Sequence, residues 1–206
     1  MTELKLYCTI ATQSVVEILM PRFEADHGTK IAVVWGTAPQ LVKRLQHDES
    51  GDVLLLNRAG VDAMMGVHRL APESVTPIAS SATAVAVRQG AAPPDISSEA
   101  ALKRSLQAAR AISYSHPDNG GASGIYFAKL LDRWGLREAI DAKTTFPPPA
   151  GLCAQYLPTG EVEFAIQQGP ELLQVPGVEI VGPLPGDLHF VTHFVAGVDT
   201  QGTHPA

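Results

Sequence analysis

The first third of the chain alternates between short apolar strands and amphipathic helices, and this alternation restricts the fold strongly. Strands are predicted over residues 4–10, 31–35 and 52–56, and a helical pattern follows each of them. The β-α-β-α-β-α order is typical of a parallel sheet that helices cover on both faces. The run DVLLL at 52–56 is almost wholly apolar, as expected for a strand buried on both sides. The sequence therefore predicts an α/β fold with doubly wound sheets.

The helical patterns indicate which side chains face the core. The first helix opens near Thr12 to Ser14 and ends at Gly28, and the second begins at Thr37 or Ala38 with Pro39 in its first turn. A short third helix is predicted over 61–65. Helical spacing predicts that two sets of apolar residues pack inward: Val15, Val16, Ile18, Leu19 and Phe23, and then Leu41, Val42 and Leu45.

The second part of the chain repeats this logic. Strands are predicted over 81–88, 111–114, 162–166, 178–181 and 190–195, and helices over 98–109, 122–134, 151–157 and 171–173. The polar segment at Ser80 and Ser81 predicts a domain change, and the chain is expected to return near His189 to His193. We expect two doubly wound β/α domains, 1–80 plus 191–206 and 81–190, joined by a two-strand hinge with a cleft between them.

Composition excludes several classes of protein. The chain has 206 residues, 45% apolar and 17% charged, which argues against disorder, and its net charge of −6 argues against nucleic-acid binding. No apolar run is long enough for membrane insertion. The N-terminus lacks the pattern of a secretory signal, so the chain as given is expected to be cytoplasmic, or periplasmic if a leader was removed. Cys8 and Cys153 are expected to be buried free thiols.

Four predicted strand-to-helix turns carry the candidate binding groups. They are rich in glycine, hydroxyls and amides and contain no lysine or arginine: TIATQS at 9–14, GTAPQ at 36–40, SHPDNGGASG at 115–124 and IQQGPE at 166–171. A helix N-terminus with free N–H groups suits an anion. Each turn alone is better explained as a capped connection, but the four together favour a small anionic ligand, bound outside the carboxyl ends of the strands.

The third turn is the most distinctive. Gly120, Gly121 and Gly124 allow the backbone to approach a ligand closely, and Ser123 is expected to cap the following helix and to donate to an anion. The stretch is neither a P-loop, because no Lys-Ser or Lys-Thr follows, nor a dinucleotide fingerprint. His116 in the same loop is either an acid–base group or an ordinary surface histidine. His189 and His193 share a strand face without a third ligand, so no metal and no cofactor are expected.

Six segments, taken in order, resemble the molybdate-binding-like branch of the periplasmic solute-binding proteins, which have the type 2 periplasmic-binding fold. These segments are LKLYCTIAT, FEADHGTKIAVVWGTAPQLVKRL, GDVLLLNRAGVDAM, AVAVRQGAAPPDIS, ISYSHPDNGGASGIYFAKLLDRWGL and GVEIVGPLPGDL. The 115–124 loop and the stretch IQQGPELL look more like a neighbouring subgroup that is similar to aconitate isomerase.

The resemblance implies where ligand contacts fall. The family's first-turn serine position falls on Ala11, beside Thr12, the second turn offers Thr37, and a late tyrosine or amide position falls near Gln167. Ser81, Ser115, Gly121 and Ser123 complete the predicted ligand-binding set. Family members usually continue into helices that pack on the first domain. Without such helices, apolar surface on the first domain is expected to be exposed or covered by a partner chain.

Three functions remain open at this stage. The first is reversible binding of an oxyanion or small organic acid by hinge closure, with an ABC transporter permease as partner if the protein is exported. The second is an isomerase that moves a double bond in a small unsaturated polycarboxylate, with His116 as the catalytic residue. The third is a sensing module that acts through a partner protein.

Overall fold

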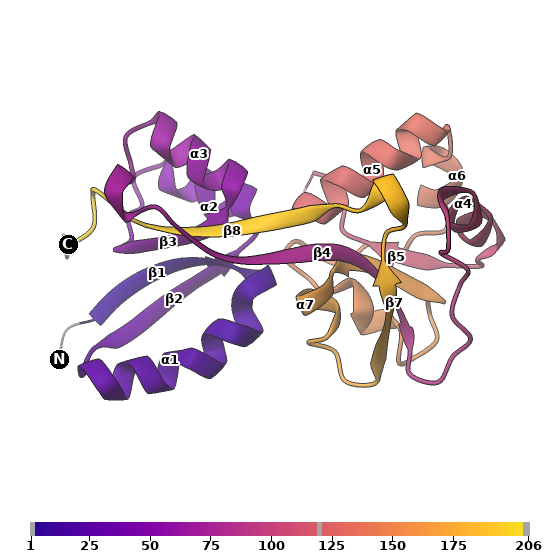
Figure 1. Ribbon diagram of the computed structural model, residues 1–206, viewed down its shortest axis with the longest axis horizontal. Helices are drawn as coiled ribbons and strands as arrows, with labels where there is room; N and C mark the ends of the chain where they lie inside the picture. Colours follow the sequence, from indigo (N-terminus) through magenta and orange to yellow (C-terminus); the bar gives the residue numbers. More distant parts are fainter. Residues whose placement is uncertain (1–2, 119–120, 204–206) are drawn as a thin grey trace. The chain divides into compact units, whose positions relative to one another are not determined.

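A computed structural model describes residues 3–118 and 121–203 of the chain as two compact units (Figure 1). The first unit comprises the residues up to Ser80 and those from His193 onward, and the second comprises Ser81–Thr192. The chain passes from one unit to the other twice, within strand β4 (Thr76–Arg88) and within strand β8 (Val191–Val198). No helix of the described residues is long and apolar enough to cross a membrane.

The first unit is built on a four-stranded sheet in the order β2-β1-β3-β8. Strands β1 (Glu3–Thr9), β2 (Lys30–Gly36) and β3 (Val53–Asn57) are parallel, and β8 is antiparallel to β3. Helices α2 (Ala38–Leu45) and α3 (Arg58–Gly66) cover one face and α1 (Gln13–His27) lies on the other (Figure 1). The main core lies under α2 and α3 and contains Tyr7, Leu41, Leu45, Leu54, Leu56, Val61, Met64, Leu70 and Val195.

Helix α1 departs from the predicted packing. Of the five apolar residues expected to face inward, only Val16 packs against the core, where it joins Cys8, Ala11, Leu55 and Phe194. The other four are exposed: Val15 by 53%, Ile18 by 76%, Leu19 by 58% and Phe23 by 39%. The prediction that these four face the core is therefore wrong, because the residues that touch the sheet form a narrower stripe than the apolar pattern suggests. These four side chains form exposed apolar surface on the first unit.

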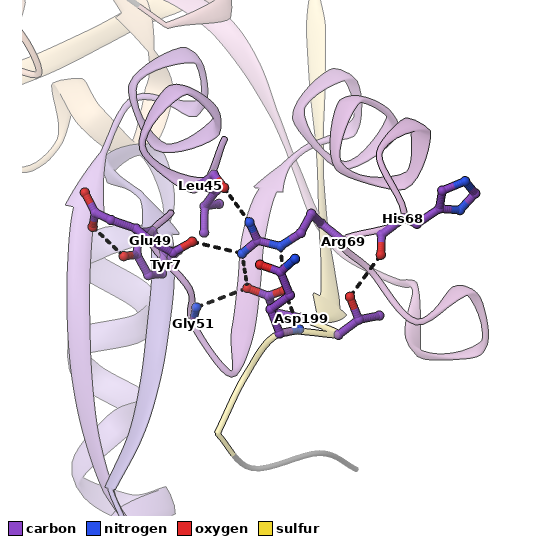
Figure 2. Close-up of polar contacts among 9 residues, drawn as sticks. Tyr7, Leu45, Glu49, Gly51, His68, Arg69 and Asp199 are labelled. Atoms are coloured by element: carbon purple, nitrogen blue, oxygen red, sulfur yellow. Dashed lines mark hydrogen bonds and ion pairs between the residues drawn. The ribbon is translucent and has the colours of Figure 1, made fainter. Parts of the chain in front are cut away.

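A buried ion pair holds the end of β8 against the loop before β3 (Figure 2). The Arg69 guanidinium donates from Nε and Nη2 to the Asp199 carboxylate at 3.0 and 2.7 Å, and also donates to the carbonyls of Leu45 and Glu49. The same carboxylate accepts the Gly51 N–H at 3.1 Å. Both charges are almost fully buried, so each depends on the other for stabilisation.

The second unit has a mixed sheet in the order β4-β6-β5, and β7 (Val178–Pro183) pairs with β4. Strands β5 (Ile112–Tyr114) and β6 (Phe164–Gln168) are parallel, whereas β4 is antiparallel to both β6 and β7. Helices α4 (Glu99–Ala108), α5 (Ala122–Trp134) and α6 (Arg137–Asp141) contribute to the larger core. The short helix α7 (Gly169–Leu172) and the 3₁₀ turn Cys153–Tyr156 contribute to a second core that contains Ala84, Ala86, Ala165 and Leu172.

Two predicted elements that involve Gln167 are wrong in their bounds. The helix expected over 151–157 is a 3₁₀ turn at Cys153–Tyr156, because the Gln167 amide holds the backbone of Gly151 and Cys153 just before it. The strand expected over 162–166 runs from Phe164 to Gln168, where the pairing of Gln167 and Gln168 with β4 extends it.

Candidate functional site

The candidate site lies at the carboxyl edge of β5 and β6 in the second unit. Because these strands are parallel, Ser115 after β5 and Gln168 at the end of β6 lie at the same edge. Helix α5 begins at this edge, and its first turn packs directly on Ser115. A Cβ at Gly124 would lie 2.3 Å from the Ser115 carbonyl oxygen, so only glycine permits this approach.

The N-terminus of α5 offers free backbone donors. Its N-cap is Gly121, and no side chain from 3–118 or 121–203 caps the helix. The N–H groups of Ala122 and Ser123 have no acceptor within the helix at these positions. The prediction that Ser123 caps α5 is wrong, because Ser123 lies inside the first turn and its hydroxyl makes no hydrogen bond among the described residues. Ser123 is nevertheless only 1% exposed. Gly120 lies outside the described residues.

Buried polar side chains from three strands gather at this edge. Gln168 and Thr83 are paired between β6 and β4, and Gln168 Nε2 donates to the Thr192 hydroxyl of β8 at 2.6 Å. Two atoms of this group, Thr83 Oγ1 and Gln168 Oε1, are buried and have no hydrogen-bond partner among the described residues. A buried polar atom without a partner costs about 1–3 kcal/mol, so it is commonly satisfied by a ligand or a water molecule.

Helix α5 is connected to this group through two aromatic rings. Tyr126 lies one turn after Ser123, on the same side of the helix. Its ring stacks on Phe190 with centroids 4.2 Å apart, and the Phe190 carbonyl accepts the Thr83 N–H at 2.9 Å. The free donors of α5 and the unpartnered atoms of Thr83 and Gln168 therefore belong to one edge of the second unit.

The Gln168 amide can present either a donor or an acceptor. In the structure the Thr192 hydroxyl accepts from Nε2 and leaves Oε1 without a partner. A hydroxyl can equally donate. A half-turn of the amide would let Thr192 donate to Oε1 and would turn the Nε2 protons toward the unpartnered position. The group can therefore donate to an anion.

Gln167 and Ser115 belong to the opposite face of the same strands. The Gln167 amide accepts the Cys153 N–H at 2.8 Å and donates to the Gly151 carbonyl at 3.2 Å. Ser115 Oγ lies 3.5 Å from Cys153 Sγ. Cys153 is a buried free thiol, as is Cys8, which confirms the expectation for both. The structure therefore places the Gln167 amide on the backbone of the 151–153 segment, while its contact with a ligand stays a prediction.

Glu171 is a buried carboxyl beside this edge. It is 5% exposed, and its Oε2 accepts the Gln168 N–H at 3.3 Å. Burial raises the pKa of the Glu171 carboxyl to about 7, and the backbone hydrogen bond opposes that rise only in part. Burial also raises the pKa of the Cys153 thiol to about 12, so this neighbour is neutral near pH 7.

His116 lies near the surface of the same loop. Its ring packs edge-on against Phe146 with centroids 4.8 Å apart, and Nδ1 accepts the Asp118 N–H at 3.3 Å. The side chain is 38% exposed. This position permits contact with a ligand, but its catalytic role stays a prediction.

The two predicted turns of the first unit use most of their polar groups locally. The Thr12 hydroxyl donates to the Thr9 carbonyl at 2.9 Å, and Ala11 is buried beside it. Thr37 is the N-cap of α2: its Oγ1 accepts the Gln40 N–H, and its own N–H donates to Gln40 Oε1. The Thr37 hydroxyl proton has no acceptor within the part of the chain that the structure describes, so it is available to donate. Ser81 is buried in β4 and its hydroxyl lies 3.4 Å from the Ala82 carbonyl.

Comparison with known proteins assigns the family. The sequence model of the family described as bacterial extracellular solute-binding protein matches residues 4–206. The chain belongs to this family. A curated relative, the aconitate isomerase of a Pseudomonas species, is 32% identical to this solute-binding protein over 191 residues, which are 90% of the chain and 71% of the relative.

Solved structures share the fold of this solute-binding protein. The periplasmic molybdate-binding protein of Azotobacter vinelandii superimposes with a TM-score of 0.74 at 14% identity, covering 98% of this chain and 87% of that one. The sulfate-binding protein of Mycobacterium tuberculosis H37Rv gives 0.71 at 14% identity, covering 99% and 78%. The predicted α/β class and the type 2 periplasmic-binding fold are confirmed.

Sequence reasoning missed the buried polar group of this solute-binding protein. Thr83, Gln168, Glu171 and Thr192 were not singled out, although Gln168 and Glu171 lie within the IQQGPE turn. The available signal was the pair of adjacent amides at the end of an apolar strand, since a strand places neighbouring side chains on opposite faces. In the structure the Gln167 amide bonds the backbone of Gly151 and Cys153, and the Gln168 amide lies on the other face of the strand.

Proposed function

We propose that this protein binds a small anion, an oxyanion or a small organic acid, at the carboxyl edge of the second unit. The observation that carries the proposal is the pair of unpartnered buried atoms, Thr83 Oγ1 and Gln168 Oε1, at the edge where α5 begins without a side-chain cap. The relatives support this ligand class, because they include proteins named for molybdate and sulfate.

Neutral donors can hold an anion without a cation. The candidate donors are the N–H groups of Ala122 and Ser123, the Ser123 and Thr83 hydroxyls, and the Gln168 amide after its half-turn. Helix N-termini favour negative charge, and hydrogen bonds to a charged group contribute about 1.5–3 kcal/mol each. Four or five such bonds are enough for a specific site. Participation of Ala11, Thr12, Thr37 and Ser81 in the same site is a further part of the proposal.

A ligand panel tests the proposal. Molybdate, tungstate, sulfate, citrate and trans-aconitate are added separately while the melting temperature is measured, because a ligand of the folded state raises it. Calorimetry then gives the affinity of the ligand that binds. Gln168→Leu should weaken it roughly ten- to hundredfold, the loss expected for one hydrogen bond to a charged group.

Two comparisons make this test specific. Gln107→Leu makes the same chemical change on an exposed position of α4 and should leave the affinity unchanged. Thr83→Val removes only the unpartnered hydroxyl and should weaken binding without loss of packing volume. If no member of the panel raises the melting temperature, the proposed function is wrong. If a ligand binds equally to Gln168→Leu, the site lies elsewhere.

A second candidate function is isomerisation of a small unsaturated polycarboxylate. The 32% identity to an aconitate isomerase favours it. Moving the double bond requires a base that removes a proton from a carbon next to it and an acid that returns a proton at the far carbon. His116, near the surface, is the candidate at this edge for contact with such a ligand, and Glu171, with a pKa of about 7, lies behind the Gln168 backbone.

Solvent exchange separates catalysis from binding. Incubation of cis- and trans-aconitate with the protein in D₂O should give carbon-bound deuterium and interconversion of the two isomers, both followed by NMR. His116→Gln should slow the exchange at least tenfold, in line with the contribution of a general base. A parent protein that binds trans-aconitate but exchanges no proton at high concentration is a binding protein only.

We propose that the protein works outside the cytoplasm with an ABC transporter permease. Membership of an extracellular solute-binding family supports this location. The fold shared with the substrate-binding domain of a putative molybdenum ABC transporter from Clostridium difficile supports the partner. Co-purification with a permease in the presence of ligand would support this assignment. Its absence would contradict the proposed partner.

A further inference from the structure

We infer that Glu171 is the group that takes up a proton when an anion binds at this edge, so that anion and proton are bound together. The inference rests on the proposed function and adds a proton to the ligand that the site accepts. Glu171 is not one of the proposed ligand contacts. Its carboxyl instead accepts a hydrogen bond from the backbone N–H of Gln168, whose side chain is one of them.

The first argument is the position of the carboxyl. Glu171 Oε2 accepts the N–H of Gln168, whose own side chain carries one of the unpartnered atoms. The carboxyl therefore contacts the backbone of the same residue whose side chain would hold the anion. A nearby like charge raises a carboxyl pKa, because the protein interior screens the repulsion less than water does.

The second argument is the absence of a compensating cation. No lysine, arginine or histidine pairs with Glu171 among the described residues, and Glu171 is 5% exposed. The 3₁₀ turn packed against α7 contributes Cys153 and Tyr156, whose hydroxyl is directed to the Phe146 carbonyl. Strand β7 contributes Glu179, which is exposed. A buried carboxylate with one hydrogen bond and no cation is costly, so the group readily becomes neutral.

The third argument is the range in which the proton is exchanged. In the folded protein without an anion, the pKa of the Glu171 carboxyl is about 7. Near neutral pH this carboxyl is therefore only partly protonated and can still accept a proton. An anion that raises this pKa by about two units would drive uptake of about half a proton at pH 7 and about 0.8 at pH 8. Apparent affinity would then fall about tenfold between pH 6 and pH 8.

Calorimetry in two buffers measures the uptake directly. Binding of molybdate and of trans-aconitate is measured in Tris and in triethanolamine, whose ionisation enthalpies differ, at pH 7 and pH 8. The difference in apparent enthalpy gives the number of protons taken up. The parent protein should show the values above. Glu171→Gln keeps the acceptor for the Gln168 N–H but cannot take up a proton, and it should show none beyond that of the ligand itself.

A matched control and a second measurement complete this test. Glu161→Gln makes the same change on an exposed carboxyl of the same unit and should behave as the parent. Should Glu171→Gln lose binding or folding, ¹³C NMR of the parent replaces it: the Glu171 carboxyl pKa should rise by about two units on saturation with ligand. Binding without proton uptake overturns this inference and leaves the proposed function intact, whereas absence of binding by both probes overturns the two together.

Discussion

The buried carboxyl of Glu171 makes the stability of the protein depend on pH. Its pKa is raised from 4.5 to about 7 in the folded state, so the folded protein keeps a proton that the unfolded chain has lost between these values. The stability that Glu171 contributes therefore falls as pH rises from about 4.5 to 7 and does not fall further above that range. Glu171→Gln removes this loss, and we expect it to stabilise the protein at pH 8 by as much as about 3 kcal/mol.

Urea unfolding of both proteins at several pH values measures this effect. The stabilisation should be largest above pH 7 and should disappear near pH 4, where Glu171 is neutral in both states. A gain that is the same at all pH values would show that the carboxyl is not the cause. Glu161→Gln, on the surface, should change stability at no pH by more than about 0.5 kcal/mol.

Two neighbouring residues in the first turn of α5 should respond differently to alanine. Ser123→Ala removes a hydroxyl that neither caps the helix nor bonds a described residue, so stability should change little. Gly124→Ala places a methyl group 2.3 Å from the Ser115 carbonyl oxygen and should cost about 1–3 kcal/mol. Denaturant unfolding gives both values. Equal losses would contradict the position of α5 against Ser115.

At the scale of elements, α1 presents an apolar surface that its own unit does not cover. Four apolar residues of this helix are exposed, and Ile18 is the most exposed at 76%. Ile18→Glu should therefore change the free energy of unfolding by less than about 0.5 kcal/mol, whereas Leu41→Ala in the buried face of α2 should cost about 2–5 kcal/mol. Chemical denaturation of both variants measures the contrast.

The same substitution should reduce self-association at high concentration, because exposed apolar patches promote it. Sedimentation velocity at several protein concentrations checks this expectation. A large loss of stability in Ile18→Glu would contradict the outward orientation of this face.

Elements with strong local signals were predictable from the sequence. Helix α5 has the predicted bounds, since an αL glycine, Gly135, ends it, and α2 begins at Ala38, one of the two predicted starts. Prediction failed where contacts between residues far apart in the sequence determine the packing of a helix or the conformation of a loop. Whether α1 buries its apolar stripe depends on which residues reach the sheet, and the 151–153 backbone is held by Gln167 from another strand. Likewise, strand periodicity separates Gln167 from Gln168 but does not tell which one lacks a partner.

At the scale of the whole molecule, the two units have separate cores. The clusters around Leu54 and around Cys8 contain only residues of the first unit, and the clusters around Phe127 and around Ala165 contain only residues of the second. Each unit therefore has its own source of hydrophobic stabilisation. The covalent connections between them are the two strands β4 and β8, which pass through both.

Disruption of the Arg69–Asp199 pair should therefore weaken the first unit selectively. Arg69→Met leaves the Asp199 carboxylate buried without its cation, and such a change costs about 3–5 kcal/mol. The guanidinium also joins the carbonyls of Leu45 and Glu49 to the end of β8, so its loss frees several segments of the first unit together (Figure 2).

Amide hydrogen exchange followed by mass spectrometry should show faster exchange in β1, β3 and α2, while β5, β6 and α5 keep the parental rates. Arg58→Met, which breaks the exposed pair with Asp62 in the same unit, should change neither set. Faster exchange in both units of Arg69→Met would show that they unfold as one cooperative body, and the separate cores would then not act as separate units of stability.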